Sequence, residues 1–202
     1  MARSNVIVGR FTVRTGTLTQ GSTTVSTADN TLSFTNHGLK TGDGIAVESG
    51  TTLPTGVSAD TKYFVITVDK NTIALATSLA NALANTRVDI TATGTGTLTF
   101  YKNGFGATTI SGIVPVGAIV TRSWTVTKTA FTSVTAGATV AIAVGGIALK
   151  SATAFDDAAF VDTDEHSVTD TITTASTALT ITVAGDTISA GDYVVCVELI
   201  PA

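Results

Sequence analysis

Side chains that commonly act as nucleophiles, general bases or metal ligands are scarce in this sequence, which has two histidines and one cysteine in 202 residues. His37 stands in a turn-like Asn-His-Gly segment, where an imidazole more often makes structural hydrogen bonds than acts in catalysis. Cys196 has no second cysteine to pair with and lies in an apolar strand pattern, which is typical of a small buried side chain. Serines and aspartates are plentiful, but without a histidine partner no Ser-His-Asp arrangement can be assembled with any specificity. The sequence therefore predicts a protein that is not an enzyme and needs no cofactor.

The densest group of charges is an acidic stretch that ends at the second histidine, His166. Its carboxylates include Asp162, Asp164 and Glu165, which supply the hard oxygen ligands that calcium prefers. Their spacing does not match the glycine-centred loop of an EF-hand, and a solvated acidic loop explains the same residues. We therefore predict no metal site and keep these three residues as weak candidates for one.

Charge and hydropathy exclude two classes of partner. The net charge is −4, and the sequence contains no cluster of Lys or Arg, which phosphate binding requires; a nucleic-acid partner is therefore not expected. The longest uncharged stretch, residues 129–149, is interrupted by Thr, Ser and Gly and alternates like strands, so we predict no membrane span. The N-terminal residues lack the apolar core of a signal peptide, and we expect synthesis as a soluble protein in a cytoplasm.

Apolar residues are nevertheless abundant. The mean hydropathy is +0.41, although only 13% of the residues are charged. Either a large buried core or an apolar surface covered by neighbouring subunits explains this excess. Residues 192–200 show it locally, because large apolar side chains occur on both faces of the predicted strand: Tyr193, Val195, Val197 and Leu199 on one face, and Val194, Cys196 and Ile200 on the other. Such a strand is central in its sheet or covered by a partner.

The elements that position these residues are predicted to be strands. Threonine makes up roughly a fifth of the chain and is β-branched, which favours strands over helices. We predict an all-β fold in three parts: an N-terminal arm or strand over residues 1–14, a small β module over residues 15–101, and a β-sandwich of the jelly-roll type over residues 102–202. The predicted strands cover residues 6–13, 31–34, 44–47, 62–68, 72–76, 95–101, 108–114, 118–128, 139–144, 148–151, 167–174, 178–184 and 192–200. One short helix is expected over residues 77–84, with Thr77 or Ser78 as its N-cap, and residues 15–29 are expected to form a loop or a weak edge ribbon.

The small module shows a particular order of turns and strands. The segment Asn36-His37-Gly38-Leu39-Lys40-Thr41-Gly42-Asp43 is followed by Leu53-Pro54-Thr55-Gly56-Val57, Tyr63-Phe64-Val65-Ile66, Thr72-Ile73-Ala74-Leu75-Ala76, Asp89-Ile90 and Gly94-Thr95-Gly96-Thr97. This order, over residues 30–100, resembles a small β module of virion structural proteins in tailed bacteriophages. The rest of the chain looks like the jelly-roll or sandwich domains of phage head decoration and fibre proteins, through Gly112-Ile113-Val114-Pro115-Val116-Gly117-Ala118 and Ala190-Gly191-Asp192-Tyr193.

The resemblance implies a capsid decoration or cement protein. It would be made in the host bacterial cytoplasm and would form a homo-oligomer, commonly a homotrimer, on the virion surface between subunits of the major capsid protein. Those proteins commonly attach through a terminal arm, which here implies capsid-binding residues among Arg3, Arg10, Phe11 and Arg14. An ordinary edge strand of the sandwich explains residues 1–14 equally well.

The alternative implied by the same resemblance is a tail-fibre, spike or head-fibre module that binds carbohydrate on the host surface. Trp124, Tyr63 and Tyr101 would then be the residues that stack on sugars. Each of the three lies in a strand pattern, where packing in the core is the default role of an aromatic ring.

Overall fold

The computed structural model of the chain describes residues 5–21, 23–114, 116–145, 147–154, 170–171 and 178–200. These residues form antiparallel sheets and one short helix, which confirms the predicted all-β class. The chain divides into two compact units: the first combines Met1–Val13 with Ala107–Ala202, and the second is Arg14–Gly106. Sequence patterns place the boundaries after residues 14 and 101 and separate the first strand from the sandwich. In the structure that strand clusters with the C-terminal unit, because it pairs with the last strand of the chain.

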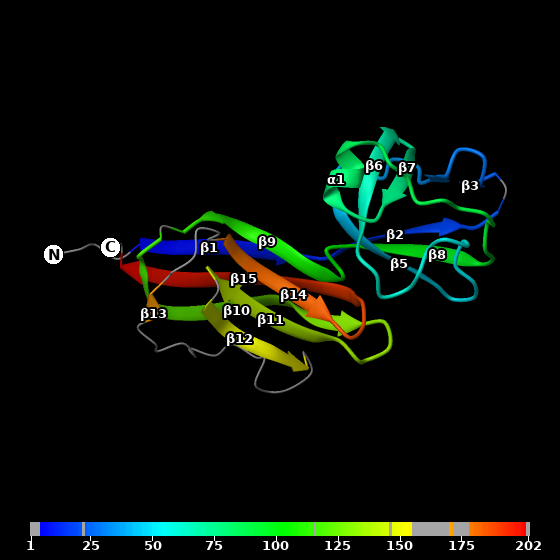
Figure 1. Ribbon diagram of the computed structural model, residues 1–202. Coiled ribbons are helices and arrows are strands. Elements are labelled where there is room, and N and C mark those ends of the chain that lie inside the picture. Colours follow the sequence, from blue (N-terminus) through cyan, green and yellow to red (C-terminus); the bar gives the residue numbers. More distant parts are fainter. Residues whose placement is uncertain are drawn as a thin grey trace. The chain divides into compact units, whose positions relative to one another are not determined.

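The first unit is a sandwich of two four-stranded sheets, which Figure 1 shows as two layers. The order of the first sheet is β1 (Asn5–Thr12), β15 (Ile188–Ile200), β10 (Ile119–Ser133) and β13 (Asp170–Thr171). The order of the second sheet is β12 (Ile147–Ala154), β11 (Thr139–Val144), β14 (Ala178–Ala184) and β9 (Gly106–Ile113). Strand β15 is therefore central, as its apolar character on both faces predicted.

The two sheets pack through side chains that alternate along each strand. Val195 and Val197 of β15 are buried, as are Ile181 and Val183 of β14. The approach is closest at Gly9, where a Cβ atom would lie 2.8 Å from the Ile110 side chain and 2.9 Å from that of Leu179. A residue without a side chain is needed on β1 at this point, because the second sheet already fills the space.

An aromatic cluster lies at the N-terminal half of β15. The Phe131 ring stacks on Tyr193 at a centroid distance of 4.1 Å and meets Phe11 edge-on at 5.7 Å. Gly191 lies against the Phe131 ring with a φ angle of +159°, and a Cβ atom here would overlap that ring. Its carbonyl accepts a hydrogen bond of 2.9 Å from the Val13 N–H, at the residue where the chain leaves the first unit.

The turn between β10 and β11 is held by the carboxylate of Asp186. Asp186 is buried and accepts hydrogen bonds from the N–H groups of Thr135 at 2.6 Å, Thr187 at 2.8 Å and Gly137 at 3.4 Å. Burial alone would raise the pKa of this carboxyl, but the hydrogen bonds from Thr135, Gly137 and Thr187 outweigh it, so its pKa lies below the ordinary range.

The second unit contains a seven-stranded sheet and the helix. The strand order is β2 (Arg14–Thr19), β8 (Thr97–Lys102), β5 (Gly44–Ser49), β6 (Tyr63–Asp69), β7 (Thr72–Ala76), β4 (Thr31–Ser33) and β3 (Val25–Ser26). The region predicted as a loop or weak edge ribbon contributes β2 at one edge and β3 at the other. Leu18 gives β2 its buried residue, and the Phe100 ring occupies the space beside Gly16.

Helix α1 (Leu79–Leu83) lies within the predicted range, and the Ser78 hydroxyl accepts a hydrogen bond of 3.1 Å from the Asn81 N–H as the N-cap. Ala82 packs with Ile66, Ala74 and Ala76 on one face of the sheet, with Phe64 against them. The other face carries the larger core, which includes Leu32, Ile45, Tyr63, Val65, Leu75 and Phe100. Among the helices that the structure describes, none has the length and apolar content to cross a membrane.

Replacing Gly191 by Ala is expected to lower the free energy of unfolding by about 1–3 kcal/mol, because the added methyl group overlaps the Phe131 ring. Gly137→Ala is the matched control, since the nearest atom to a Cβ there is the Asp186 Cβ at an ordinary contact of 3.7 Å. Urea denaturation of both variants measures the difference. Equal stability of the two variants would contradict the packing described here.

Acid is expected to destabilise the wild type more than Asp186→Asn. Because the pKa of Asp186 is lower in the folded protein, its contribution is present above the unfolded pKa of about 3.9 and is lost as the pH falls through the folded value. Denaturation curves between neutral and strongly acidic pH, measured on both proteins, should therefore converge at low pH. A constant difference across that range would show that the carboxylate does not hold the turn in its charged form.

Candidate interaction surface

The outward face of the first sheet brings together apolar residues from three strands. Residues that pair directly across antiparallel strands lie on the same face of the sheet. Val8 of β1 pairs with Cys196 of β15, which pairs with Trp124 of β10. Val194 of β15 pairs in the same way with Val126 of β10. Val6 extends the set along β1, two residues before Val8. We call these six residues, Val6, Val8, Trp124, Val126, Val194 and Cys196, the apolar outer face.

Much of this face is open to solvent. Val8 is 58% exposed, Val6 51% and Val126 42%, while Trp124 and Val194 are half-buried. Antiparallel sheets usually place apolar residues on one face and polar residues on the other. Here the inward face is already apolar, so the outward valines and tryptophan are an excess that the sandwich core does not require.

The second sheet supplies the contrast. Its outward residues on the central strands pair as Thr139 with Ala184, Ala141 with Thr182, and Ala143 with Thr180. These small and polar residues are ordinary for a solvated sheet face. The two outer faces of the sandwich therefore differ in chemistry, and only the face formed by β1, β15 and β10 carries large apolar side chains on its central strands.

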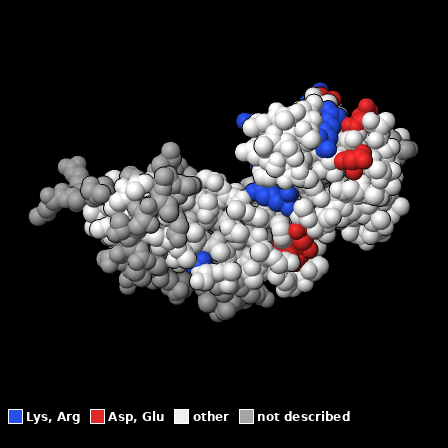
Figure 2. All heavy atoms as spheres, viewed as in Figure 1, with Lys and Arg blue, Asp and Glu red and all other residues white. Residues whose placement is uncertain are grey.

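Charged groups share the face with these residues. Glu198 of β15 pairs with Val6 on one side and with Arg122 on the other, and Arg10 pairs with Val194. The Arg10 guanidinium donates two hydrogen bonds to the Asp192 carboxylate, Nε to Oδ1 at 2.9 Å and Nη2 to Oδ2 at 2.6 Å. These bonds and the positive charge lower the pKa of Asp192, although its partial desolvation opposes them. Arg122 lies over the Trp124 ring, with 5.2 Å between its guanidinium carbon and the ring centroid. Elsewhere charge is sparse, and most of the surface that Figure 2 shows for the described residues is uncharged.

The residues that the sequence assigned to a capsid-binding arm have different surroundings in the structure. Phe11 is 1% exposed and belongs to the aromatic cluster, because alternation along β1 turns it away from Arg10. Arg14 begins β2 in the second unit, whereas Arg10 belongs to the first. Arg3 lies outside the described residues. Of the four residues, Arg10 is the one that borders the apolar outer face.

The aromatic residues considered for carbohydrate binding differ in burial and in the unit to which they belong. Tyr63 is buried, and its hydroxyl accepts a hydrogen bond of 2.9 Å from the Ser58 N–H. Tyr101 is half-buried on β8 of the second unit, and Trp124 belongs to the first unit. Core packing, the default role, therefore holds for Tyr63, and Trp124 is the member of the set that lies on an apolar open surface.

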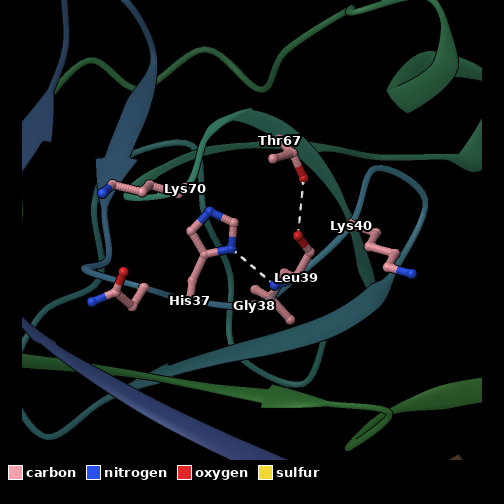
Figure 3. Close-up of a pocket in the computed structure, with 7 residues that line it drawn as sticks. His37, Gly38, Leu39, Lys40, Thr67 and Lys70 are labelled. Carbon is pink, nitrogen blue, oxygen red and sulfur yellow. Dashed lines mark hydrogen bonds between the residues drawn. The ribbon is translucent and has the colours of Figure 1, made fainter.

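His37 lines a pocket of about 400 Å³ in the second unit, together with Asn36, Gly38, Leu39, Lys40, Thr67 and Lys70 (Figure 3). Its Nδ1 accepts a hydrogen bond of 2.9 Å from the Leu39 N–H, so Nε2 carries the proton and donates to the Asp69 carbonyl at 2.8 Å. Both ring nitrogens are thus engaged with the backbone, as expected of a structural histidine. In Figure 3 the ammonium groups of Lys40 and Lys70 point away from the ring, so the pocket does not gather positive charge.

A second pocket of about 380 Å³ lies beside helix α1 and shares Thr67 with the first. Leu83, which is 71% exposed, and Val68 lie along it, and Arg87 is at its border. Leu83 extends from a helix of only five residues.

The candidate metal ligands Asp162, Asp164 and Glu165 lie outside the described residues, as does His166. Within the part of the chain that the structure describes, no three His, Cys, Asp or Glu side chains gather in a way that would hold a metal ion.

Solved structures of phage origin are among those similar to this chain. A chain of the capsid asymmetric unit of cyanophage Pam1 matches 48% of this chain and 72% of its own length, with 26% identity and a TM-score of 0.36. The major capsid protein P2 of bacteriophage PM2 matches over 98% of this chain and 91% of its own length, with 11% identity and a TM-score of 0.29. TM-scores this low do not establish a shared fold. No protein-family model and no curated protein matches the sequence.

The sequence alone did not bring the apolar outer face together. Alternation along β15 places Val194 and Cys196 on the face opposite Val195, and the sequence predicts this division into two faces. Which residues of other strands lie beside them depends on strand order and register, and neither has a local sequence signal.

Cys196 provides a chemical test of this geometry. The thiol lies in the centre of the face but is only 8% exposed, and burial raises its pKa. Because the thiolate is the reactive form, we expect Cys196 to react with a disulfide reagent about tenfold or more slowly than free cysteine at neutral pH. Release of thionitrobenzoate measures the rate, and the same protein in denaturant is the control. Rapid reaction in the folded protein would contradict the placement of this side chain.

Proposed function

We propose that this chain is a non-enzymatic structural protein of a tailed-bacteriophage virion. In this proposal it decorates and stabilises the capsid by binding between subunits of the major capsid protein. The single observation that carries the proposal is the apolar outer face, which the first unit presents on its β1–β15–β10 sheet although the sandwich core does not need it. A protein partner that covers this face would remove the exposed valines and Trp124 from water.

The energetic gain from covering the face is substantial. About half of the surface of Val6, Val8 and Val126 remains in water, and burying the rest of each side chain contributes on the order of 1 kcal/mol. Half-buried Trp124 adds a large ring near the centre, a position where aromatic residues commonly dominate binding energy. These terms suit attachment to a protein surface better than binding of a soluble ligand, because they come from a broad sheet face and not from a cavity.

The border of the face fits a specific contact. Arg10 is already paired with Asp192, so its guanidinium does not present an uncompensated charge beside the adjacent valines. Arg122 lies over Trp124 and is itself exposed, which places a cation beside the aromatic ring. A polar border around an apolar centre is the usual anatomy of a protein–protein interface.

The resemblance of residues 30–100 to a small virion module supplies the link to phages. Low charge and high mean hydropathy are consistent with a chain that works within a larger assembly. Carbohydrate binding in a tail-fibre, spike or head-fibre module is the second candidate, and the observation in its favour is the partly exposed ring of Trp124. Tyr63, another ring of the carbohydrate hypothesis, is buried and so is not available to stack on a sugar.

The proposal is tested by binding to tail-free heads that lack this protein. Val126→Lys places a charge within the apolar outer face, and we expect it to reduce occupancy of the heads about tenfold or more, since the charge must then be buried in the contact. Thr182→Lys is the matched control, because Thr182 is exposed on the outer face of the second sheet and should leave binding unchanged. Sedimentation of heads with bound protein, followed by quantitative mass spectrometry, measures occupancy.

Two results would overturn the proposal. Equal occupancy of heads by Val126→Lys and the wild type would remove the apolar outer face from the attachment. Recovery of the protein with tails, together with binding to cells or glycans that is lost in Trp124→Ala, would favour the carbohydrate-binding alternative. In the proposed role, heads without the protein should also rupture at a lower temperature than heads that carry it.

A further inference from the structure

Strand β1 forms an open edge of the first sheet. It pairs on one side with β15 through eight consecutive residue pairs, from Asn5 with Leu199 to Thr12 with Asp192, and the pairing has no bulge. Among the residues that the structure describes, the sheet order places no strand on its other side. Half of the backbone N–H and C=O groups of β1 therefore face away from β15, in a regular row that can receive another strand.

This edge lacks the features by which proteins usually prevent strand pairing. Such features are proline, lysine, a bulge or a very short strand. Residues Asn5–Thr12 contain neither proline nor lysine, and their one charged residue, Arg10, is held by Asp192 on the neighbouring strand.

The edges of the other sheet in the sandwich supply a comparison. Strand β12 carries Lys150, and its pairing with β11 is interrupted by two register shifts. The lysine charges this edge, and the register shifts distort it. Strand β1 thus combines a regular backbone with exposed Val6 and Val8, which is the combination that favours addition of a strand.

We propose that two copies of this chain associate through antiparallel pairing of their β1 strands around a two-fold axis centred at Ile7. The two four-stranded sheets would then form one continuous sheet. Pairing that is centred at Ile7 places Val6 opposite Val8 of the second copy and Ile7 opposite its own equivalent. With this axis, paired residues lie an even number of positions apart in the sequence. Because side chains alternate between the two faces along a strand, side chains of the same face meet across the axis.

The charges favour this register. With the axis at Ile7, each Arg10 lies beyond the paired valines and keeps its contact with Asp192. If the axis moved to Val8, Arg10 would lie opposite Val6 of the second copy, and a guanidinium would enter the apolar row. Among the described residues, pairing at Ile7 therefore sets Val6 against Val8 and places no two like charges opposite each other.

A second copy is favoured as the partner of the β1 edge, because this edge is continuous with the apolar outer face. Val6 and Val8 belong to both the edge and that face, so two-fold pairing joins the faces of the two copies across the axis. The joined face would present the valines and tryptophans of both copies on one side of a single sheet. This inference stands on the strand edge and does not require that the protein belong to a virion.

The first test is the mass and the hydrogen exchange of the intact wild-type protein. Sedimentation velocity should show a dimer that dissociates on dilution. Hydrogen–deuterium exchange should show increased protection of residues 5–12 at high protein concentration and no comparable change in β10. A monomer at all concentrations, or protection that does not depend on concentration, would overturn the proposal. A mass three times that of the chain would support the trimer implied by the family resemblance and would also overturn it.

Two variants test whether the copies associate through the β1 edge or through the part of the apolar outer face that lies on β10. Val8→Lys charges the edge strand and should shift the dissociation constant of the dimer about tenfold or more, whereas Val126→Lys lies on β10 and should leave the dimer intact. Val126→Lys is also the variant expected to lose binding to heads, so a failure of dimerisation and a failure of capsid binding can be told apart. Loss of the dimer in both variants would assign association to the apolar outer face instead of the edge.

A cross-link tests the register without charging the edge. In a Cys196→Ser background, Ile7→Cys should form a disulfide-linked dimer under mild oxidation, because directly opposite residues of antiparallel strands have Cα atoms about 4.5–5.5 Å apart. Val126→Cys in the same background is the control and should remain monomeric on non-reducing gels. Absence of the Ile7 cross-link in a protein that sediments as a dimer would overturn pairing centred at this residue.

Discussion

The first unit depends on the position of β15 between β1 and β10. Residues near the two ends of the sequence must meet before this sheet exists, since Asn5 pairs with Leu199 and Thr12 with Asp192. The same strand pairs with β10 on its other side. The hydrogen bond from Val13 to Gly191 then fixes the residue at which the chain leaves the sandwich. Pairings of such long sequence separation carry a high entropic cost of closure, which the large apolar content of β15 offsets.

The same strand links folding to the proposed binding role. Tyr193, Val195, Val197 and Leu199 face the core, so their burial holds the two sheets together. Val194 and Cys196 face outward and align with Val126 and Trp124 on one side and with Val8 on the other. A strand with two apolar faces therefore stabilises the unit and also creates a surface that gains free energy when another protein covers it.

Local sequence patterns predicted the strands well and their partners poorly. The strand at Thr72–Ala76 and the Ser78 cap follow from β-branched residues and from side-chain hydrogen bonding, both of which act over a few residues. Strand β2 was harder to recognise, because Arg14–Thr19 contains one large apolar residue, Leu18, and becomes a strand through pairing with β8. The burial of Phe11 was equally hard to recognise, since it depends on Phe131, which is distant in the sequence.

The sequence by itself determined the all-β class, the alternation of each strand and the scarcity of side chains for catalysis, because these properties depend on residue type and short spacing. Only the tertiary structure decided that residues 5–12 complete the C-terminal sandwich and that Val8, Cys196 and Trp124 form one row. Strand order and register decide which residues meet, and they are set by the packing of the whole unit. For the same reason, the sequence did not identify the apolar outer face, which exists only where valines and a tryptophan from three strands lie side by side.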